Sequence, residues 1–342
     1  MKILIDVLHP KHVHFFRPLI TRWSEQGATV SILTRDKDIT HQLLDLYEIP
    51  YTCLSKQPKA SRLVVELVER WWQMGKCLRE FRPDIVLSVA GVSTALPSKC
   101  LGIPNILFTD TETATVSNRL SFPFADRILT PEWYRGDMGR RHVRYRGFHE
   151  WSYLHPKEFT PDPDLVRSEG INPDEPYAIM RLVANAAAHD FLETGLSAAG
   201  ALKLVQHLER RMKVYLSSEA EPPRDLRPYL TRFRVDHMHH ILAYASMLVG
   251  DSPSMGTEAA LLGVPSVVIS SWAGRCGNMQ VLEREFELMQ VYQRSTDALE
   301  AVLHLADHPL SRQETQAKRH ALVSTLDYLP EVVDYHIQDL IG

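Results

Sequence analysis

A hydroxyl-rich turn followed by a glutamate is the part of the sequence best suited to chemistry. The segment GDSPSMGTE follows a short apolar run and ends at Glu258. Ser252 followed by proline is typical of a helix start, with Ser252 as the N-cap. The helix dipole, the N–H groups of Ser254 and Met255 and the two serine hydroxyls would then attract an anion. The turn is therefore predicted to bind phosphate.

Glu258 lies four residues after Ser254, so both side chains share one face of the predicted helix. A carboxylate one turn beyond a phosphate site is well placed to accept hydrogen bonds from ribose hydroxyls. The segment therefore predicts a site for a nucleoside diphosphate. The alternative is an ordinary capped helix with a solvated glutamate.

Two series of alternating strands and helices would position these residues. Apolar runs such as Lys2–Val7 and Tyr177–Leu182 are typical of buried parallel strands. Helical spacing of apolar residues predicts a helix over Val13–Gln26. Ala125–Leu129 is predicted to be the last strand of the first series, and a proline-dense stretch at 156–176 separates the two.

We therefore expect an α/β fold of two doubly wound, Rossmann-like domains facing a cleft. The expected boundaries are 1–150 for the first domain, 151–175 for a linker, 176–325 for the second domain, and 326–342 for a helix that could cross back to the first domain.

Further candidates follow the predicted strands of the first domain, where ligands bind in doubly wound sheets. His9, His12 and His14 come after the first strand, and substrate contacts or proton transfer suit them better than a metal site. Asp110 and Glu112 follow a later strand. They are candidates for acid–base catalysis, with helix capping as the alternative.

The second domain has its own strand-end candidates. Arg181 could meet a substrate anion, and His189 could be catalytic, contact phosphate or cap a helix. Arg275 and Asn278 lie in a glycine-rich turn and are candidate partners of the sugar or diphosphate, unless the turn is purely structural. Other polar candidates are Ser218 and Glu219 at a strand end, and His237, His239 and His240 as nucleotide-base or packing neighbours.

Composition limits the class of protein. A length of 342 residues suits two domains, and 44% apolar with 23% charged residues is ordinary for a globular chain. A net charge of −4 gives no reason to expect a nucleic-acid partner, although local basic patches remain open. Four scattered cysteines and a first strand without signal-peptide features favour a cytoplasmic protein with at most peripheral membrane contact.

The central segment resembles a known group of enzymes. GDSPSMGTEAALLGVPSVVI is similar to the nucleotide-sugar segment of GT-B-fold UDP-N-acetylglucosamine 2-epimerases. The resemblance places Ser252 and Ser254 on the diphosphate turn and Glu258 on the ribose-binding glutamate. Pro253-Ser254 stands where that family has Gly-Gly, so diphosphate binding cannot be identical.

The first half carries the resemblance further. PDIVLSVAGVSTALPSKCLGIPNILFTDTET and the following SNRL place Asp110 on a catalytic-region acid and Asn118-Arg119 on an Asn-Arg pair of the epimerases. The second acid of that family has no secure counterpart. Most of the chain also resembles domain of unknown function 354, a GT-B-like family, in HPKHVHFF, GFHEWSYLHP, MRLVANAAAHD, LSSEAE and DHMHHILAYASMLVGDSPSMGTEA.

The resulting hypothesis is a GT-B glycosyltransferase of glycan or polysaccharide biosynthesis that uses a nucleotide sugar, expected to be UDP-linked, and an unknown acceptor. No Asp-x-Asp motif lies in a suitable loop, so no metal or other cofactor is expected. His12 or Asp110 would accept the proton, with His189 as a third catalytic candidate. Arg181 or Arg275 would stabilise the leaving diphosphate. The alternatives are a 2-epimerase or related hydrolase, and a non-catalytic nucleotide-sugar-binding protein; the oligomeric state stays open, with a dimer as one option.

Overall fold

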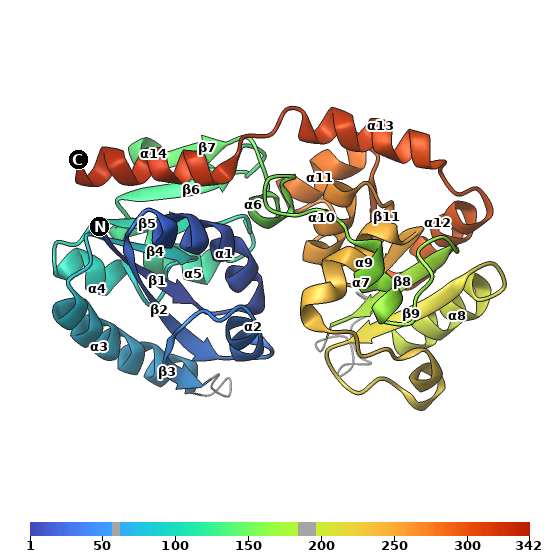
Figure 1. Ribbon diagram of the computed structural model, residues 1–342, viewed down its shortest axis with the longest axis horizontal. Helices are drawn as coiled ribbons and strands as arrows, with labels where there is room; N and C mark the ends of the chain where they lie inside the picture. Colours follow the sequence, from blue (N-terminus) through green and yellow to red (C-terminus); the bar gives the residue numbers. More distant parts are fainter. Residues whose placement is uncertain (57–61, 184–195) are drawn as a thin grey trace. The chain divides into compact units, whose positions relative to one another are not determined.

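The computed structural model describes residues 1–56, 62–183 and 196–342. The chain divides into two compact units (Figure 1), Met1–Glu158 with Asp327–Gly342 as unit 1 and Phe159–Leu326 as unit 2. Each unit contains one parallel β-sheet, as the sequence predicts. His189 lies outside the described residues.

Unit 1 is built on a seven-stranded sheet in the order β3-β2-β1-β4-β5-β6-β7. All the pairings are parallel, and the strand order reverses between β1 and β4, where doubly wound sheets place their ligands. The strands are β1 Lys2–Val7, β2 Thr29–Asp36, β3 Thr52–Lys56, β4 Ile85–Val89, β5 Asn105–Phe108, β6 Arg127–Pro131 and β7 His142–Tyr145.

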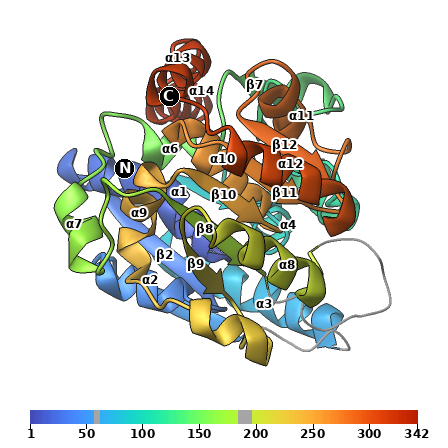
Figure 2. The same cartoon turned by 90° about the vertical axis from the view of Figure 1, so that its right-hand side faces the viewer.

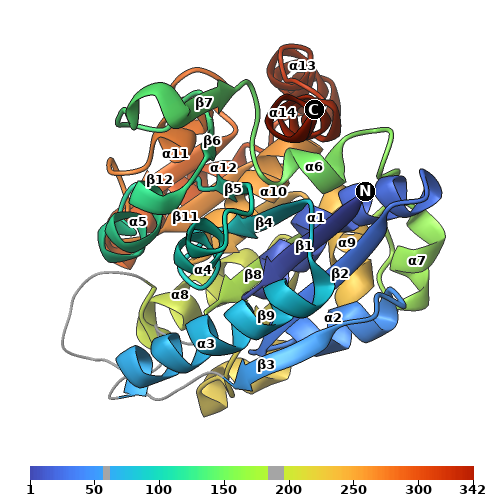
Figure 3. The same ribbon diagram turned by 90° about the vertical axis from the view of Figure 1, so that its left-hand side faces the viewer.

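Helices cover both faces of this sheet. Figure 3 shows α3, α4 and α5 in front of the strands, and Leu4 and Val86 of the sheet pack there against Met74 and Leu78 of α3. The last helix, α14, belongs to unit 1, because Asp334 bonds to the indole of Trp23 in α1 at 2.6 Å. The helices are α1 Pro10–Glu25, α2 Thr40–Leu46, α3 Leu63–Phe81, α4 Ala95–Cys100, α5 Thr115–Ser121, α6 Trp151–Leu154 and α14 Leu329–Ile341, with 3-10 turns η2 Phe122–Phe124 and η3 Gly139–Arg141.

Unit 2 is built on a five-stranded sheet in the order β12-β11-β10-β8-β9. Its strand order reverses between β8 and β10, so their carboxyl ends mark the expected ligand position. The strands are β8 Tyr177–Leu182, β9 Lys213–Ser218, β10 Met247–Gly250, β11 Ser266–Ile269 and β12 Met289–Tyr292.

The helices of unit 2 form two layers around its sheet. Figure 2 shows α8 and α12 on the near side of the strands, where Met180 and Val249 pack against Leu204 and Val302. The helices are α7 Pro163–Ser168, α8 Ala198–Leu208, α9 Met238–Tyr244, α10 Pro253–Leu262, α11 Gly277–Arg284, α12 Ser295–Asp307 and α13 Arg312–Val323, with 3-10 turns η5 Arg224–Tyr229 and η6 Val235–His237.

Two local predictions differ from the structure. The first helix begins at Pro10 rather than near Val13, because His9 caps it and proline suits its first position. The predicted linker 151–175 contains α6 and α7, and the division between units falls after Glu158. All four residues of α6 are buried, since three of them are large and apolar and pack as core rather than as linker.

One further property concerns membranes. Across the described ranges, every helix is too short or too polar to span a lipid bilayer.

Candidate functional site

The amino end of α10 has the cap that the sequence predicts. Ser252 is the N-cap, and its Oγ accepts a hydrogen bond from the N–H of Met255 at 3.4 Å. That N–H is therefore engaged within the cap, and its role in binding a ligand stays a prediction. Ser254, half-buried at the second helical position, carries the remaining predicted N–H and hydroxyl donors. The dipole of this ten-residue helix still favours an anion here.

Glu258 is buried deeper in the same helix. Its exposed fraction is 7%, and its Oε1 lies 3.2 Å from Nε2 of His239 in α9. A carboxylate in this position is not the solvated glutamate of the alternative interpretation. Burying a carboxylate costs free energy unless polar groups contact it. The buried position of Glu258 beside His239 therefore favours a role in binding. His239 is thus a direct neighbour of the predicted ribose acceptor.

Arg181 lies at the end of β8, beside the end of β10. Its guanidinium donates to Oγ of Ser217 at 2.7 Å and to Oε1 of Glu219 at 2.6 Å. The Glu219 carboxylate thus neutralises much of the charge that was predicted to meet a substrate anion. Gly250 pairs with Arg181 across the strands, and a Cβ there would lie 2.2 Å from the Arg181 carbonyl oxygen. The close approach of β8 and β10 therefore requires glycine at 250.

Asp251 is a residue of this edge that the sequence did not single out. Its Oδ1 accepts a hydrogen bond from the N–H of Val183 at 2.8 Å. Its Oδ2 is buried and has no hydrogen-bond partner in the described part of the chain. Burial raises the pKa of Asp251 to about 6. Asp251 thus holds the chain after β8 in place and has one oxygen left for a donor.

The other predicted residues of unit 2 differ in accessibility. Asn278 is buried in the first turn of α11, and its Oδ1 lacks a hydrogen-bond partner among the residues that the structure describes. Arg275 is exposed in the preceding turn. The hydroxyl of Ser218 donates to the carbonyl of Ala220 at 2.7 Å, so it stabilises its own turn. Of Asn278, Arg275 and Ser218, Asn278 is therefore the best suited to contact a ligand.

In unit 1, the structure brings together four charged or titratable residues, which we call the lysine cluster: Lys11, Asp110, His149 and Glu150. Nζ of Lys11 lies 2.6 Å from Oδ2 of Asp110 and 2.8 Å from Oε1 of Glu150. Nδ1 of His149 lies 3.3 Å from the same Asp110 oxygen. These residues follow β1, β5 and β7, so all of them lie at the carboxyl edge of the sheet.

The two carboxylates of the lysine cluster differ in protonation. Burial would raise the pKa of Asp110, but His149 and Lys11 outweigh it and hold that pKa below its usual value. Burial also lowers the pKa of His149, to about 4, so the imidazole is neutral at pH 7 and Lys11 is the cation that keeps Asp110 ionised. For Glu150 burial prevails and raises the pKa to about 7. Asp110 is therefore a fixed charge, whereas Glu150 can exchange a proton near neutral pH.

The lysine cluster and the neighbouring Tyr145 contain buried polar atoms that are open to a ligand. Oε2 of Glu150, Nε2 of His149 and the hydroxyl of Tyr145 are buried without hydrogen-bond partners within the described ranges. The rings of Tyr145 and His149 stack with centroids 6.5 Å apart. Since buried polar groups are normally satisfied, three orphaned atoms in one cluster indicate a site for polar ligand groups.

The histidines after β1 have defined partners in the structure, and their roles in substrate contact or proton transfer stay predictions. Nδ1 of His12 accepts a hydrogen bond from the N–H of Leu8 at 3.2 Å, so the neutral ring carries its proton on Nε2. Burial, His9 and Lys11 hold the pKa of His12 well below its usual value. This favours a donor role over the predicted base role. His9 caps α1, and the ring of His14 lies 5.4 Å from that of Tyr153.

The remaining candidates of unit 1 surround the loop after Asp110. Oε1 of Glu112 accepts a hydrogen bond from the N–H of Arg135 at 3.1 Å. Asn118 is buried and donates to the hydroxyl of Tyr134 at 3.2 Å, and Arg119 is exposed beside it. The bonds of Glu112 and Asn118 shape the loop that follows Asp110.

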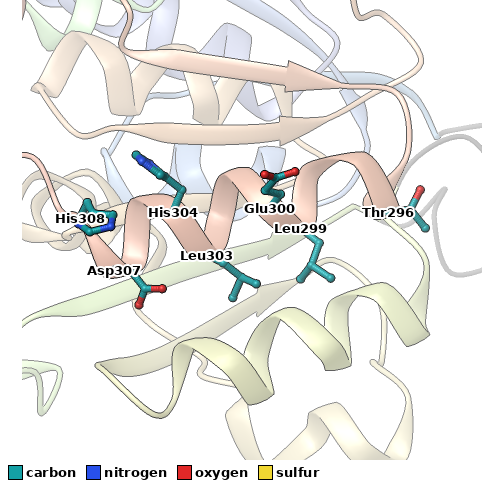
Figure 4. Close-up of a pocket in the computed structure, with 7 residues that line it drawn as sticks. All are labelled: Thr296, Leu299, Glu300, Leu303, His304, Asp307 and His308. Atoms are coloured by element: carbon teal, nitrogen blue, oxygen red, sulfur yellow. The ribbon is translucent and has the colours of Figure 1, made fainter.

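The hollow over α12 of unit 2 does not suggest a further catalytic centre. The volume of this hollow is about 380 Å³. In Figure 4, Glu300 and His304, which line it, point to one side of the helix, and Leu299 and Leu303 to the other. These side chains do not converge, and none is a predicted site residue. Within the described residues, no group of three or more His, Cys, Asp or Glu side chains could hold a metal ion.

The sequence predicted Asp110 but missed Lys11, His149 and Glu150. Lys11 lies in HPKHVHFF, between histidines that drew attention as titratable groups. His149 and Glu150 lie in GFHEW, directly after the short strand β7. A polar His-Glu pair between apolar residues at a strand end was the available signal.

Comparisons with known proteins agree with this architecture. The structure resembles that of the Staphylococcus aureus MnaA–UDP complex with a TM-score of 0.73 and 14% identity, covering 99% of this chain and 96% of that one. It resembles UDP-GlcNAc 2-epimerase from Neisseria meningitidis bound to UDP-GlcNAc with a TM-score of 0.71 and 12% identity, covering 99% and 100%. For MurG of Acinetobacter baumannii the TM-score is 0.60 and the identity 15%, again covering 99% and 100%.

These similarities identify the two-sheet architecture as the GT-B fold. In sequence, the chain is 22% identical over 282 residues to the uncharacterized protein MJ0665 of Methanocaldococcus jannaschii, covering 78% of this chain and 81% of that protein. The family model described as protein of unknown function (DUF354) matches residues 1–334. The chain therefore belongs to the DUF354 family.

Proposed function

We propose that this protein is a GT-B enzyme that transfers a sugar from a nucleoside diphosphate sugar, expected to be UDP-linked, to an acceptor hydroxyl without a metal ion. The observation that carries the proposal is the buried Glu258 beside His239, one turn beyond the capped amino end of α10. An anion-attracting helix end and a candidate ribose acceptor on the same helix support this ligand class. UDP or UDP-GlcNAc in the similar solved structures supports the same ligand class.

In the proposed reaction, α10 and Ser254 bind the diphosphate and Glu258 accepts hydrogen bonds from the ribose hydroxyls. The acceptor oxygen forms a bond to the anomeric carbon as the bond from that carbon to the diphosphate oxygen breaks. The electron pair leaves with the diphosphate, which the helix dipole stabilises. The proton of the acceptor hydroxyl needs a base, and within unit 1 the pKa of about 7 suits Glu150 to take it up on Oε2.

A second candidate function is 2-epimerisation of a UDP-sugar. The lysine cluster favours it, because Glu150 supplies a second acid beside Asp110, which the sequence alone did not provide. Incubation with UDP-GlcNAc and other nucleotide sugars separates the two reactions. UDP release that requires an acceptor supports transfer, and formation of the 2-epimer without acceptor supports epimerisation.

The nucleotide site is tested by Glu258→Gln. Glutamine keeps the side-chain shape but loses the charge, so UDP should bind roughly 10- to 100-fold more weakly. Calorimetric titration with UDP and with 2′,3′-dideoxy-UDP measures this, and the variant should lose most of its preference for the ribose hydroxyls. The matched control is Glu300→Gln, which removes an exposed charge from α12 of the same unit. Unchanged UDP affinity in Glu258→Gln would refute the assignment.

A further inference from the structure

A second hollow lies in unit 1. Neither the lysine cluster nor the predicted nucleotide-binding residues of unit 2 line it. Its volume is about 520 Å³, and it is formed by the end of α5, η2, β6 and the chain leading into η3. Phe122, Ile128 and Met138 give it an apolar part. Arg119, of the predicted Asn-Arg pair, also lines it. An apolar hollow with arginine suits a ligand that is partly apolar and partly anionic.

The chain around this hollow is basic in a protein that is acidic overall. The twelve residues RGDMGRRHVRYR, from Arg135 to Arg146, contain five arginines and one aspartate, or +5 − 1 = +4, against −4 for the whole chain. Two of these arginines, Arg140 and Arg141, line the hollow together with Arg119. Three guanidinium groups therefore converge on one partly apolar hollow.

Other arginines of the basic segment have structural partners. Arg144 donates to the carbonyl groups of Glu132 at 2.9 Å and Tyr134 at 2.6 Å, and Arg146 pairs with the Glu132 carboxylate at 3.1 Å. These two guanidinium groups stabilise the loop before η3.

The arginines of the hollow differ from them. Arg141 donates only to the carbonyl of Pro123, at 2.8 Å, in the described part of the chain. Among the described residues, Arg119, Arg140 and Arg141 form no ion pair with a carboxylate. No carboxylate of the described residues therefore neutralises these three positive charges.

Asn118 connects this hollow to the loop of the lysine cluster. It lines the hollow, and its Nδ2 lies 3.5 Å from the carbonyl oxygen of Thr111, the residue after Asp110. Its Oδ1 is buried, and no described residue donates to it. This orphaned amide oxygen can accept a hydrogen bond from a ligand hydroxyl.

We propose that this hollow binds the acceptor substrate, and that the acceptor is an organic phosphate with an apolar body and a free hydroxyl. Three guanidinium groups suit the several oxygens and the higher charge of a phosphate better than a single carboxylate. Phe122, Ile128 and Met138 contact the apolar body, and Oδ1 of Asn118 accepts a hydrogen bond from the hydroxyl. The acceptor role rests on the proposed glycosyl transfer, whereas binding of the organic phosphate does not.

Octyl phosphate, held below its micelle concentration, is the probe, and calorimetry measures its binding. We expect octyl phosphate to bind. Methyl phosphate lacks the apolar chain and octanol lacks the phosphate, so each should bind at least about tenfold more weakly. The double variant Arg140→Gln, Arg141→Gln should weaken octyl phosphate by about tenfold or more. The control Arg146→Gln removes a guanidinium of the same segment that does not line the hollow, and should leave binding unchanged.

A separate variant tests the apolar part of the hollow. Met138→Gln should weaken octyl phosphate severalfold but leave methyl phosphate unchanged, which a general loss of folding could not do. Equal binding of octyl phosphate by wild type and the double arginine variant would overturn the proposal, as would equal affinity for methyl and octyl phosphate.

The outcomes also separate this proposal from the function proposed above. Loss of UDP binding in Glu258→Gln with unchanged octyl phosphate binding supports two independent sites. If UDP binds and octyl phosphate does not, the inference about the hollow fails and the nucleotide site stands. Displacement of octyl phosphate by vesicles containing phosphatidic acid would identify a lipid as the source of the phosphate. Equally strong displacement by soluble hexose 6-phosphate, which has no apolar body, would contradict the proposal.

Discussion

Replacing Glu150 with glutamine should make the protein more stable at alkaline pH while impairing its chemistry. Burial raises the pKa of this carboxyl from 4.5 to about 7 in the folded protein. Between those values the folded state binds more protons than the unfolded chain, so the unfolding free energy of wild type falls as the pH rises. A shift of about 2.5 units corresponds to about 3 kcal/mol, fully lost only above pH 7. Glutamine is neutral throughout and escapes this loss.

Thermal unfolding at pH 5 and pH 8.5 measures the effect. The variant and wild type should unfold within about 1 °C of each other at pH 5, and the variant roughly 5–10 °C higher at pH 8.5. Glu331→Gln, which removes a largely exposed charge from α14 of the same unit, is the control and should show no such pH dependence. A difference between Glu150→Gln and wild type that is equal at both pH values would refute the titration of Glu150 in this range.

Two further predictions concern α10. His239→Ala should weaken UDP binding severalfold because Glu258 loses a polar neighbour, and His239→Asn should restore part of it; equal affinities in calorimetry would exclude a positioning role. Gly256→Ala should destabilise the protein by about 1–3 kcal/mol, since its Cβ would lie 2.5 Å from Cγ2 of Val268. Gly75→Ala, which has room in α3, should instead stabilise by about 0.5–1 kcal/mol in chemical denaturation, and a reversed order would contradict the packing argument.

The fold was predictable because its signals are local. The buried strands β1 and β8 are short apolar runs without polar alternation, which is how fully covered parallel strands appear in sequence. The seventh strand was not predicted as such. The strand β7 is only four residues long, HVRY, with just Tyr145 fully buried, so its pattern resembles a loop. It became a strand through parallel pairing with β6, an interaction that no local pattern reveals.

The same distinction separates the two parts of the candidate site. The cap at Ser252 and Glu258 lie on one helix, so spacing alone places them. The lysine cluster joins residues from the ends of three strands, with Lys11 and Asp110 separated by 99 positions. Only the order of strands in the sheet brings these side chains together. The sequence could therefore name Asp110 as an acid but could not find its partners.

The partners also change what each acid can do, and this decides which carboxyl can exchange a proton near neutral pH. Two carboxylates contact the single ammonium group of Lys11. Asp110 also lies beside His149 and accepts a hydrogen bond from Thr111, so it stays ionised and its charge orients its neighbours. Glu150 is only 2% exposed, and fewer polar groups offset the cost of burying its charge. Its Oε2 has no partner among the described residues, so Glu150 can gain or lose a proton near neutral pH. One cation shared by two buried acids thus gives a fixed charge and a proton carrier, a division that residue type alone cannot predict.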